Sequence, residues 1–375
     1  MQPLSDMHIH LISFDVPFPP NYGGVIDIYY KLKKLKENNV SVTLHCFEYG
    51  RGEQNELNEL CKEVFYYKRK SGLLYQFSFL PYIVITRSNN QLLKNVLKDS
   101  SPIFFEGIHC CYLLNHKALQ QRKKIVRMHN VESDYYLGLA RSEKNLFKKI
   151  FFKLEAFKLK WFEQKLQYAN LVFAISLNDK NYFLSFHNNV QILPPFHPFN
   201  YVISTPGKST FCLYHGNLAV SENNEAALYL TEKIFNDLEA TLIIAGNAPS
   251  SELKNAVKKY KNIQLLPDVG TEDIWKLVSN AHINVLPTFQ NTGVKLKLLV
   301  ALYTGRFCLV NNPMVENTGL ERNCEIANSS EKMKQKIIEL LSQHFSEMDI
   351  KQRSQNLENN YSSDMAISQV INALQ

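Results

Sequence analysis

Short apolar runs alternate with amphipathic segments along most of the 375-residue chain. Apolar runs rich in β-branched and aromatic residues predict buried strands, and apolar residues three or four positions apart predict helices. The predicted strands are 8–14, 41–47, 102–107, 123–130, 170–176, 190–196, 211–217, 240–246, 263–268, 282–287 and 307–312. The helical patterns between and after them include 23–39, 144–168, 223–235, 250–260, 271–280, 293–304 and a terminal helix. This alternation is typical of parallel sheets with right-handed crossovers.

The alternation is interrupted once, by a stretch containing Pro, Gly and Ser that follows residue 196. It restarts at residue 211, so the chain has two strand–helix series, as its length leads one to expect. We therefore predict an α/β protein with two Rossmann-like domains that face each other across a cleft. Open α/β sheets bind ligands at the carboxyl ends of their strands, so the candidate residues are sought there.

Composition limits the function classes. The chain is 45% hydrophobic and 21% charged, with a net charge of +7, which fits a soluble protein that binds an anion, an acidic membrane surface or nucleic acid. The lysines are dispersed and no basic-aromatic recognition motif is present, so we predict no nucleic-acid partner. Seven cysteines form no CxxC pair, which predicts free thiols and no metal site. Without a signal-like or membrane-spanning segment we expect a cytoplasmic protein, with peripheral contact to the inner face of the membrane left open.

Glycines follow three of the predicted strands. Gly23-Gly24 opens the first helix, where paired glycines admit a phosphate or acceptor to the helix amides, or form a plain turn. In the second half, Gly216-Asn217 and Gly246-Asn247 end two strands. Their asparagines offer hydrogen bonds to a sugar or phosphate, or simply cap and turn the chain.

The segment "RMHNVE" places His129, Asn130 and Glu132 at a strand-to-helix transition. Either His129 faces the cleft as a catalytic residue, or the three residues form a helix cap, with Asn130 as N-cap and Glu132 in the first turn. Glu106 ends another predicted strand and is a candidate acceptor ligand or base.

Two lysines lie where the helix in "TGVKLKLLVALY" begins. With Thr292 or Gly293 as N-cap, Lys295 and Lys297 fall near the first turn, where the helix dipole disfavours a cation by about 0.3–1 kcal/mol. Either the lysines are solvated, or an anion lies between them and the helix amides.

Several segments in order resemble the retaining nucleotide-sugar glycosyltransferases of family 4, which have the GT-B architecture. They are "PPNYGG", "VRMHNVESDYY", "EQKLQYANLVFAISLND", "HGNLAVSENN", "LIIAGNAP" and "AHINVLPTFQNTGVKLKLLVALYTGRFCLVN". The resemblance implies an acceptor-binding domain at 1–196, a nucleotide-sugar domain at 197–355 and a helix at 356–375 that crosses back to the first domain. It also implies a reaction without metal or cofactor.

The resemblance assigns the donor's diphosphate to the segment at Gly293, Val294, Lys295, Leu296 and Lys297. Lys295 is then the phosphate cation and Lys297 its support. The family's two glutamates, one toward the donor sugar and one on the ribose, correspond to Thr292 and Val300 here, so both carboxylates are replaced.

Helix 144–168 is basic and aromatic. Phe147, Ile150, Phe151, Leu154, Phe157 and Trp161 form one broad apolar face, with Lys149, Lys153 and Lys160 opposite. Such a helix packs in a core with its lysines solvated, or docks on an anionic membrane.

These observations predict a glycosyltransferase that moves a hexose-type sugar from a nucleotide-sugar donor to a glycan, lipid-linked or protein-linked acceptor. Two alternatives stay open: a nucleotide-sugar epimerase of the same fold, and a non-catalytic nucleotide- or carbohydrate-binding protein.

Overall fold

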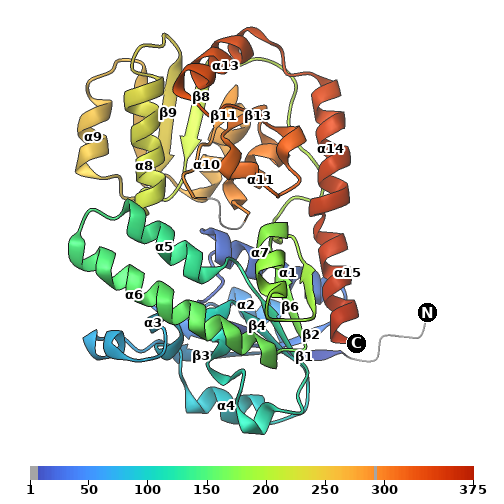
Figure 1. Cartoon of the computed structure of the whole chain (residues 1–375). Helices are drawn as coiled ribbons and strands as arrows, with labels where there is room; N and C mark the ends of the chain where they lie inside the picture. Colours follow the sequence, from blue (N-terminus) through green and yellow to red (C-terminus); the bar gives the residue numbers. More distant parts are fainter. Residues whose placement is uncertain (1–6, 291–293) are drawn as a thin grey trace. The chain divides into compact units, whose positions relative to one another are not determined.

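The computed structural model describes residues 7–290 and 294–375, which form two compact units (Figure 1). Unit 1 takes the chain up to Ala140, then Leu146–Pro198 and Ser362–Gln375. Unit 2 comprises Arg141–Asn145 and Phe199–Tyr361. The chain thus passes from unit 1 to unit 2 after Pro198, beside the predicted break, and it returns to unit 1 at Ser362.

Unit 1 contains a parallel sheet of seven strands in the order β3-β2-β1-β4-β5-β6-β7. The strands are β1 (His8–Ser13), β2 (Ser41–Glu48), β3 (Glu63–Lys68), β4 (Ile103–Glu106), β5 (Lys124–Arg127), β6 (Leu171–Ala174) and β7 (Val190–Ile192). The strands β1, β2, β4, β5 and β6 are buried along almost their whole length, which explains why they coincide with apolar runs in the sequence.

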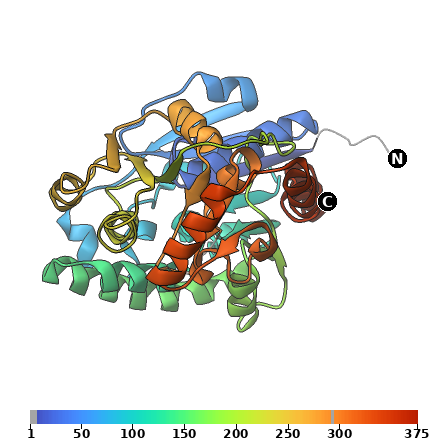
Figure 2. The ribbon, with the colours of Figure 1, turned by 90° about the horizontal axis from the view of Figure 1, so that it is seen from above.

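Helices and short 3₁₀ segments join these strands. They are α1 (Gly23–Glu37), α2 (Glu56–Leu60), η1 (Leu73–Phe77), α3 (Tyr82–Ile85), α4 (Asn90–Val96), η2 (Ile108–Leu113), η3 (Lys117–Leu119), α5 (Glu132–Ser142), α6 (Leu146–Glu163), η4 (Gln164–Tyr168) and α7 (Leu177–Leu184). The last helix, α15 (Ser363–Leu374), packs against α1, and it is the dark red helix beside the C label in Figure 2. Its apolar face enters the same core cluster as β1 and α1.

Unit 2 contains a second parallel sheet, of six strands in the order β10-β9-β8-β11-β12-β13. Its strands are β8 (Phe211–His215), β9 (Thr241–Gly246), β10 (Ile263–Pro267), β11 (Ile283–Val285), β12 (Phe307–Val310) and β13 (Glu325–Ile326). Because β8 and β2 belong to different sheets, the predicted α/β fold with two Rossmann-like domains is confirmed.

The helices of unit 2 follow the predicted alternation. They are α8 (Ser221–Tyr229), which continues into one π-helical segment, η5 (Leu230–Ile234), then α9 (Ser251–Val257), α10 (Thr271–Asn280), α11 (Leu296–Thr304), α12 (Asn312–Val315), η6 (Glu321–Asn323), α13 (Ser330–Ser342) and α14 (Glu347–Tyr361). Arg353 fixes α14 to the end of α11, since its Nη1 donates to the carbonyl oxygens of Leu302 at 3.1 Å and Gly305 at 2.8 Å.

In a core helix with a solvated lysine face, the apolar face would be buried. The long helix α6 instead leaves this face exposed. Its apolar stripe is exposed, with Phe147 84% and Phe157 76% accessible. Its buried residues are Glu155, Ala156, Leu159, Phe162 and Glu163. The core alternative for the predicted apolar face is therefore wrong. Hydrogen bonds explain the buried carboxylates: Glu155 accepts from the Tyr82 amide, and Glu163 accepts from Ser133 and Tyr182. Among the described residues, no helix has both the length and the apolar character required to cross a bilayer.

Candidate functional site

Four charged residues and one histidine at the carboxyl edge of the unit 1 sheet form what we call the buried ion network: Asp27, Lys31, Glu106, Arg127 and His129. Asp27 and Lys31 lie one turn apart on α1, Glu106 ends β4, Arg127 ends β5, and His129 follows two residues later. The first four side chains are at most 1% exposed and His129 is 12% exposed.

Lys31 and His129 hold Glu106 from two sides. Lys31 Nζ lies 2.5 Å from Glu106 Oε1, and His129 Nε2 lies 3.0 Å from Glu106 Oε2. Burial by itself raises the pKa of Glu106, but the Lys31 charge and the His129 hydrogen bond outweigh it and hold the pKa below its usual value. Glu106 is thus an enclosed carboxylate, so it has no surface with which to contact an acceptor.

Asp27 completes the network. Its Oδ2 lies 3.3 Å from Arg127 Nη2 and 3.5 Å from His129 Nδ1, and its Oδ1 lies 3.8 Å from Lys31 Nζ. Burial opposes ionisation, but Lys31, Arg127 and His129 lower the pKa of Asp27 to about 2. Both ring nitrogens of His129 therefore face carboxylate oxygens, and these two contacts fix the orientation of the ring.

Phe14 occupies the space beside the predicted glycine pair. A Cβ on Gly24 would lie 2.5 Å from Cζ of Phe14, so this glycine accommodates an aromatic ring. The same ring packs edge-on against His129, with the ring centres 5.4 Å apart. Gly23 is the exposed first residue of α1. Gly24 thus leaves room for Phe14 to pack against His129 in the buried ion network.

Glu132 is the first residue of α5 and is buried. Burial raises its pKa to about 8, although a 3.4 Å hydrogen bond from Asn130 Nδ2 opposes the shift. The nearby Glu163 charge adds to the rise. Glu132 is therefore a protonated acid at neutral pH, whereas an ionised first-turn carboxylate would be expected from a helix cap.

In unit 2, the loops after β8 and β9 touch. A Cβ on Gly246 would lie 1.8 Å from the carbonyl oxygen of Gly216, so only glycine fits there. Asn217 is exposed and builds the turn, since its Oδ1 accepts from the Ala219 amide at 3.1 Å. Asn247 is exposed as well. The four predicted residues thus lie together at the carboxyl edge of β8 and β9.

Helix α11 begins at Leu296, later than the predicted 293, and its N-cap is Lys295. Thr292 and Gly293 lie outside the described residues, and Val294 is buried. Lys297 turns toward α8, where its Nζ lies 3.0 Å from Asn223 Oδ1.

The hydrogen-bond partners of Lys297, Asn223 and Tyr214, are neutral. Its Nζ also lies 3.4 Å from the Tyr214 hydroxyl and 4.9 Å from the centre of the Tyr214 ring. Burial lowers its pKa to about 8, against the opposing charge of Glu222, and Lys295 adds to the lowering. Within 7–290 and 294–375, no carboxylate lies within ion-pair distance of this ammonium. Val300 is 7% exposed.

A histidine cluster lies at the opposite, amino-terminal end of β1. The ligand atoms of His8, His10 and Asp99 are within 4.8 Å of one another, which makes them the group in the described chain best placed for a metal. Each side chain already has protein partners, however. His10 bonds His45 at 2.9 Å and Asp99 at 3.0 Å, and His8 bonds Thr43 at 2.9 Å.

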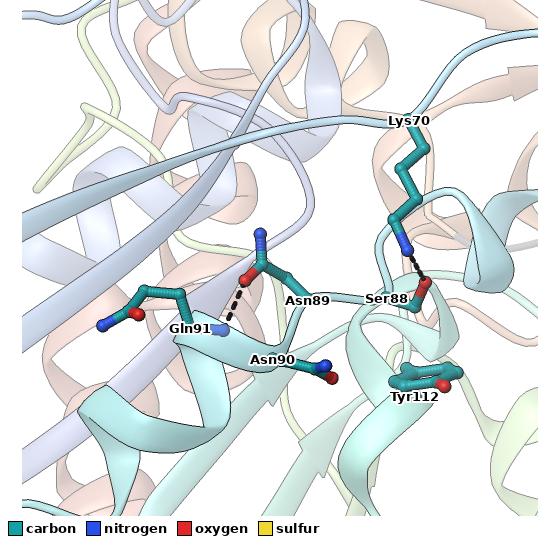
Figure 3. A pocket seen from close by; sticks show the side chains of 6 residues that line it. All are labelled: Lys70, Ser88, Asn89, Asn90, Gln91 and Tyr112. Atoms are coloured by element: carbon teal, nitrogen blue, oxygen red, sulfur yellow. Dashed lines mark hydrogen bonds between the residues drawn. The ribbon is translucent and has the colours of Figure 1, made fainter.

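A separate pocket of about 420 Å³ lies in unit 1 (Figure 3). Its lining residues are Lys70, Ser88, Asn89, Asn90, Gln91 and Tyr112. Lys70 Nζ donates to Ser88 Oγ at 2.7 Å, and Asn89 Oδ1 accepts from the Gln91 amide at 2.7 Å, as the dashed lines show. It contains none of the residues predicted for the site.

Sequence reasoning did not find Asp27, Lys31 and Arg127. Asp27 and Lys31 are an i,i+4 pair in a helix that contains further lysines, which is the usual pattern of a solvated face. Their partners lie far away in sequence, with Glu106 75 positions after Lys31. The signal available at this sheet edge was a glycine that follows a predicted strand. It indicated Gly24, which lies against Phe14, and it did not indicate the charged residues.

No family model matches the chain. A protein of Klebsiella pneumoniae named "Uncharacterized 44.6 kDa protein in cps region" is 29% identical over 335 residues, which cover 83% of this chain and 84% of that protein.

Solved structures resemble the whole chain. TarM aligns with a TM-score of 0.68 and 10% identity over 100% of both chains. Anabaena HepE in complex with UDP and glucose aligns with a TM-score of 0.67 and 11% identity, covering 98% of this chain and 99% of its own. A UDP-forming trehalose-phosphate synthase of Burkholderia xenovorans gives 0.65 and 10%, covering 98% and 100%. With its two parallel-sheet Rossmann-like domains, the chain has the fold of the GT-B glycosyltransferases.

Proposed function

We propose that the protein is a glycosyltransferase that moves a hexose-type sugar from a nucleotide-sugar donor to a glycan, lipid-linked or protein-linked acceptor. Residues 197–355 bind the donor, residues 1–196 bind the acceptor, and the terminal helix α15 completes the first domain. The GT-B fold supports the reaction class. The relative named for a cps region supports a role in surface polysaccharide or glycoconjugate synthesis.

The environment of Lys297 carries the proposal. A half-buried ammonium surrounded by an amide oxygen and a tyrosine, without a carboxylate in the described chain at ion-pair distance, is electrostatically incomplete. Lys295, at the N-cap of α11, adds a second cation nearby. A diphosphate supplies the missing negative charge and also accepts from the helix amides.

In the proposed reaction the bond from the sugar's anomeric carbon to the diphosphate breaks, and a bond from that carbon to an acceptor oxygen forms. The acceptor hydroxyl gives its proton to the departing diphosphate, so the products are the new glycoside and the nucleoside diphosphate. Negative charge grows on the leaving diphosphate, and Lys295 and Lys297 stabilise it electrostatically. Gly216, Asn217, Gly246 and Asn247 border the donor, as do Thr292, Gly293 and Val294, which precede α11 in the sequence. We propose retention of the anomeric configuration, and a reaction without metal or cofactor, on the family resemblance.

We further propose His129 as the catalytic residue of residues 1–196, because it is the member of the buried ion network with the most accessible surface. Glu106 acts through His129 and is a positioning residue, since it is fully buried. Gly23, Gly24, Asn130 and Glu132 surround the acceptor side. The proposal includes peripheral binding of a cytoplasmic protein to an anionic membrane through α6.

The test is donor binding and turnover. Isothermal titration with UDP-, GDP- and dTDP-hexoses identifies the donor. Lys297→Ala and Lys295→Ala each remove a charge-assisted contact worth roughly 1.5–3 kcal/mol, so the affinity should fall by about ten- to a hundredfold. Lys276→Ala, at a lysine of α10 that is 71% exposed, is the matched control and should bind like the parent.

Products separate the alternatives. Release of nucleoside diphosphate, with a new glycoside detected by mass spectrometry and its anomer assigned by NMR, supports the transferase. Conversion of the donor into an epimer supports the epimerase. Tight binding without turnover on any acceptor panel supports a binding protein. If Lys297→Ala bound every donor as the parent does, the donor site would have to lie elsewhere.

A further inference from the structure

The segment before α3 exposes large apolar side chains that the helical patterns in the sequence did not predict. In η1 and the four residues after it, Leu73 is 72% exposed, Leu74 86%, Phe77 84% and Phe79 95%. Side chains this exposed make few contacts within the chain, so folding does not account for their apolar character.

This segment lies beside α6. Lys158 Nζ of α6 donates to the carbonyl oxygen of Gln76 at 3.1 Å, and the Tyr82 ring packs against Phe151 with the ring centres 6.2 Å apart. Glu155 of α6 accepts from the Tyr82 amide at 2.5 Å. These contacts join residues 73–82 and α6 into one part of unit 1.

The apolar stripe of α6 adds to the exposed surface. Its members recur three or four positions apart, and each is about half exposed or more: Leu146, Phe147, Ile150, Leu154, Phe157 and Trp161. Together with Leu73, Leu74, Phe77 and Phe79, we call them the apolar anchor.

The charges around the apolar anchor have one sign. Residues 64–98 contain six Lys or Arg residues and no Asp or Glu. Members of the apolar stripe of α6 are directly preceded or followed in the sequence by Lys148, Lys149, Lys153 and Lys160. The two glutamates of this helix are fully buried. Only positive charge therefore reaches the surface of these two elements, and it attracts an anionic partner.

Composition decides between a bilayer and a protein partner. Protein interfaces are depleted of lysine at their centres, because a buried ammonium must be desolvated. At a lipid surface, lysine stems lie along the acyl boundary with their ammonium groups at the phosphates, and aromatic side chains occupy the headgroup region. Phe and Trp interleaved with lysine fit the second arrangement.

We infer that η1 and α6 together form a docking surface for an anionic lipid bilayer, with residues 73–79 as a second insertion point besides the helix. Contact through two elements fixes the orientation of unit 1 on the membrane, which one helix alone would leave free to roll. The inference extends the membrane part of the proposed function, but it does not depend on glycosyl transfer.

Vesicle flotation tests it. The full chain should float with phosphatidylcholine vesicles that contain about 30% phosphatidylglycerol, and only weakly with phosphatidylcholine alone. Phe77→Ser/Phe79→Ser and Phe147→Ser/Phe157→Ser should each weaken partitioning at least about tenfold, because each pair removes two exposed aromatic rings that would enter the bilayer. Ile338→Ser/Met348→Ser is the matched control, since these unit 2 residues are 61% and 64% exposed. It should float like the parent.

Fluorescence gives a second measurement. In a Trp275→Phe background, Trp161 is the remaining tryptophan. Its emission should shift to the blue with anionic vesicles. Lys149→Glu/Lys153→Glu/Lys160→Glu should abolish both the shift and flotation. Release of nucleoside diphosphate with a water-soluble acceptor should be unchanged in all these variants, so loss of docking and loss of transfer are distinguishable.

Three results would overturn the inference. The first is equal flotation with neutral and anionic vesicles. The second is a Phe77→Ser/Phe79→Ser variant that floats like the parent, which would show that η1 is not part of the docking surface. The third is an oligomer by light scattering that the same serine substitutions dissociate while the parent binds no vesicles, which would make the apolar anchor an interface between copies of the chain.

Discussion

Lys31→Met tests whether the buried ion network stabilises the fold through charge balance. Methionine keeps an unbranched stem against Phe104 and Phe196, whose ring centres lie 5.1 and 5.5 Å from the Lys31 ammonium. At an effective dielectric constant of about 20, unit charges 2.5 Å apart attract by roughly 7 kcal/mol before desolvation is subtracted. Since desolvation cancels much of this, and since Glu106 and Asp27 stay buried without their shared cation, we expect a loss of about 3–5 kcal/mol.

The assay is urea unfolding at pH 7.5, followed by circular dichroism. Lys34→Met on the same helix is the matched control, because Lys34 forms ion pairs with the exposed Glu37 and Asp364 and should cost less than about 1 kcal/mol. Lys31→Met/Glu106→Gln removes both charges. It should recover at least about 2 kcal/mol of the loss.

The pH dependence gives an independent check. In the parent the pKa of Glu106 is below its unfolded value, so its contribution to stability is present above about pH 4.5 and is lost as the pH falls. Without Lys31, burial raises that pKa above the unfolded value, so the folded variant takes up a proton first. The deficit of Lys31→Met should therefore shrink as the pH falls from 7.5 toward about 4.5. A pH-independent loss below about 1 kcal/mol, or a double variant no more stable than the single one, would refute the charge-balance argument.

Three further changes test packing and burial. Gly246→Ala should cost about 1–3 kcal/mol in urea unfolding, because its Cβ meets a backbone oxygen at 1.8 Å, whereas Gly270→Ala, with open space around it, should cost less than about 1. Val300→Glu should cost several kcal/mol by placing a carboxylate at a buried position, and Ile338→Glu, at an exposed one, should leave the melting temperature unchanged. Burial lowers the pKa of His215 to about 3, so at pH 5.5 this histidine takes up a proton only in the unfolded chain. Between pH 7.5 and pH 5.5 this residue should therefore lower the free energy of unfolding by roughly 1.4 kcal/mol. His215→Asn should lack that part of the loss.

The strands were predictable wherever both sheet faces are covered. β4 and β12 are buried at every position, so their apolar runs carry a clear signal. β3 was missed because an edge strand with the sequence EVFYYK is largely half-exposed and mixes charge with aromatic residues. The sequence also predicted one terminal helix, where α14 and α15 are separate helices in different units.

The sites were less predictable than the strands. Glycines and asparagines after β8 and β9 mark a sheet edge from local sequence alone, because turns need those residue types. The partners of Lys31 depend on how distant strands are ordered in the sheet, which periodicity does not report. Periodicity also cannot say which side of α6 faces inward, because buried carboxylates there rely on hydrogen bonds from other segments.

The return of α15 to unit 1 has a consequence for biosynthesis. Ala366, Ile367, Val370 and Leu374 belong to the core cluster that also contains Ile9 of β1 and Leu32 of α1. A ribosome that has finished residue 198 must add the whole of Phe199–Tyr361 before this helix exists. At about 5–20 residues per second, unit 1 waits on the order of ten to thirty seconds with one face of its core uncovered. Unit 2, encoded almost entirely as one continuous stretch, can complete its core first, so the order of maturation is the reverse of the order of synthesis.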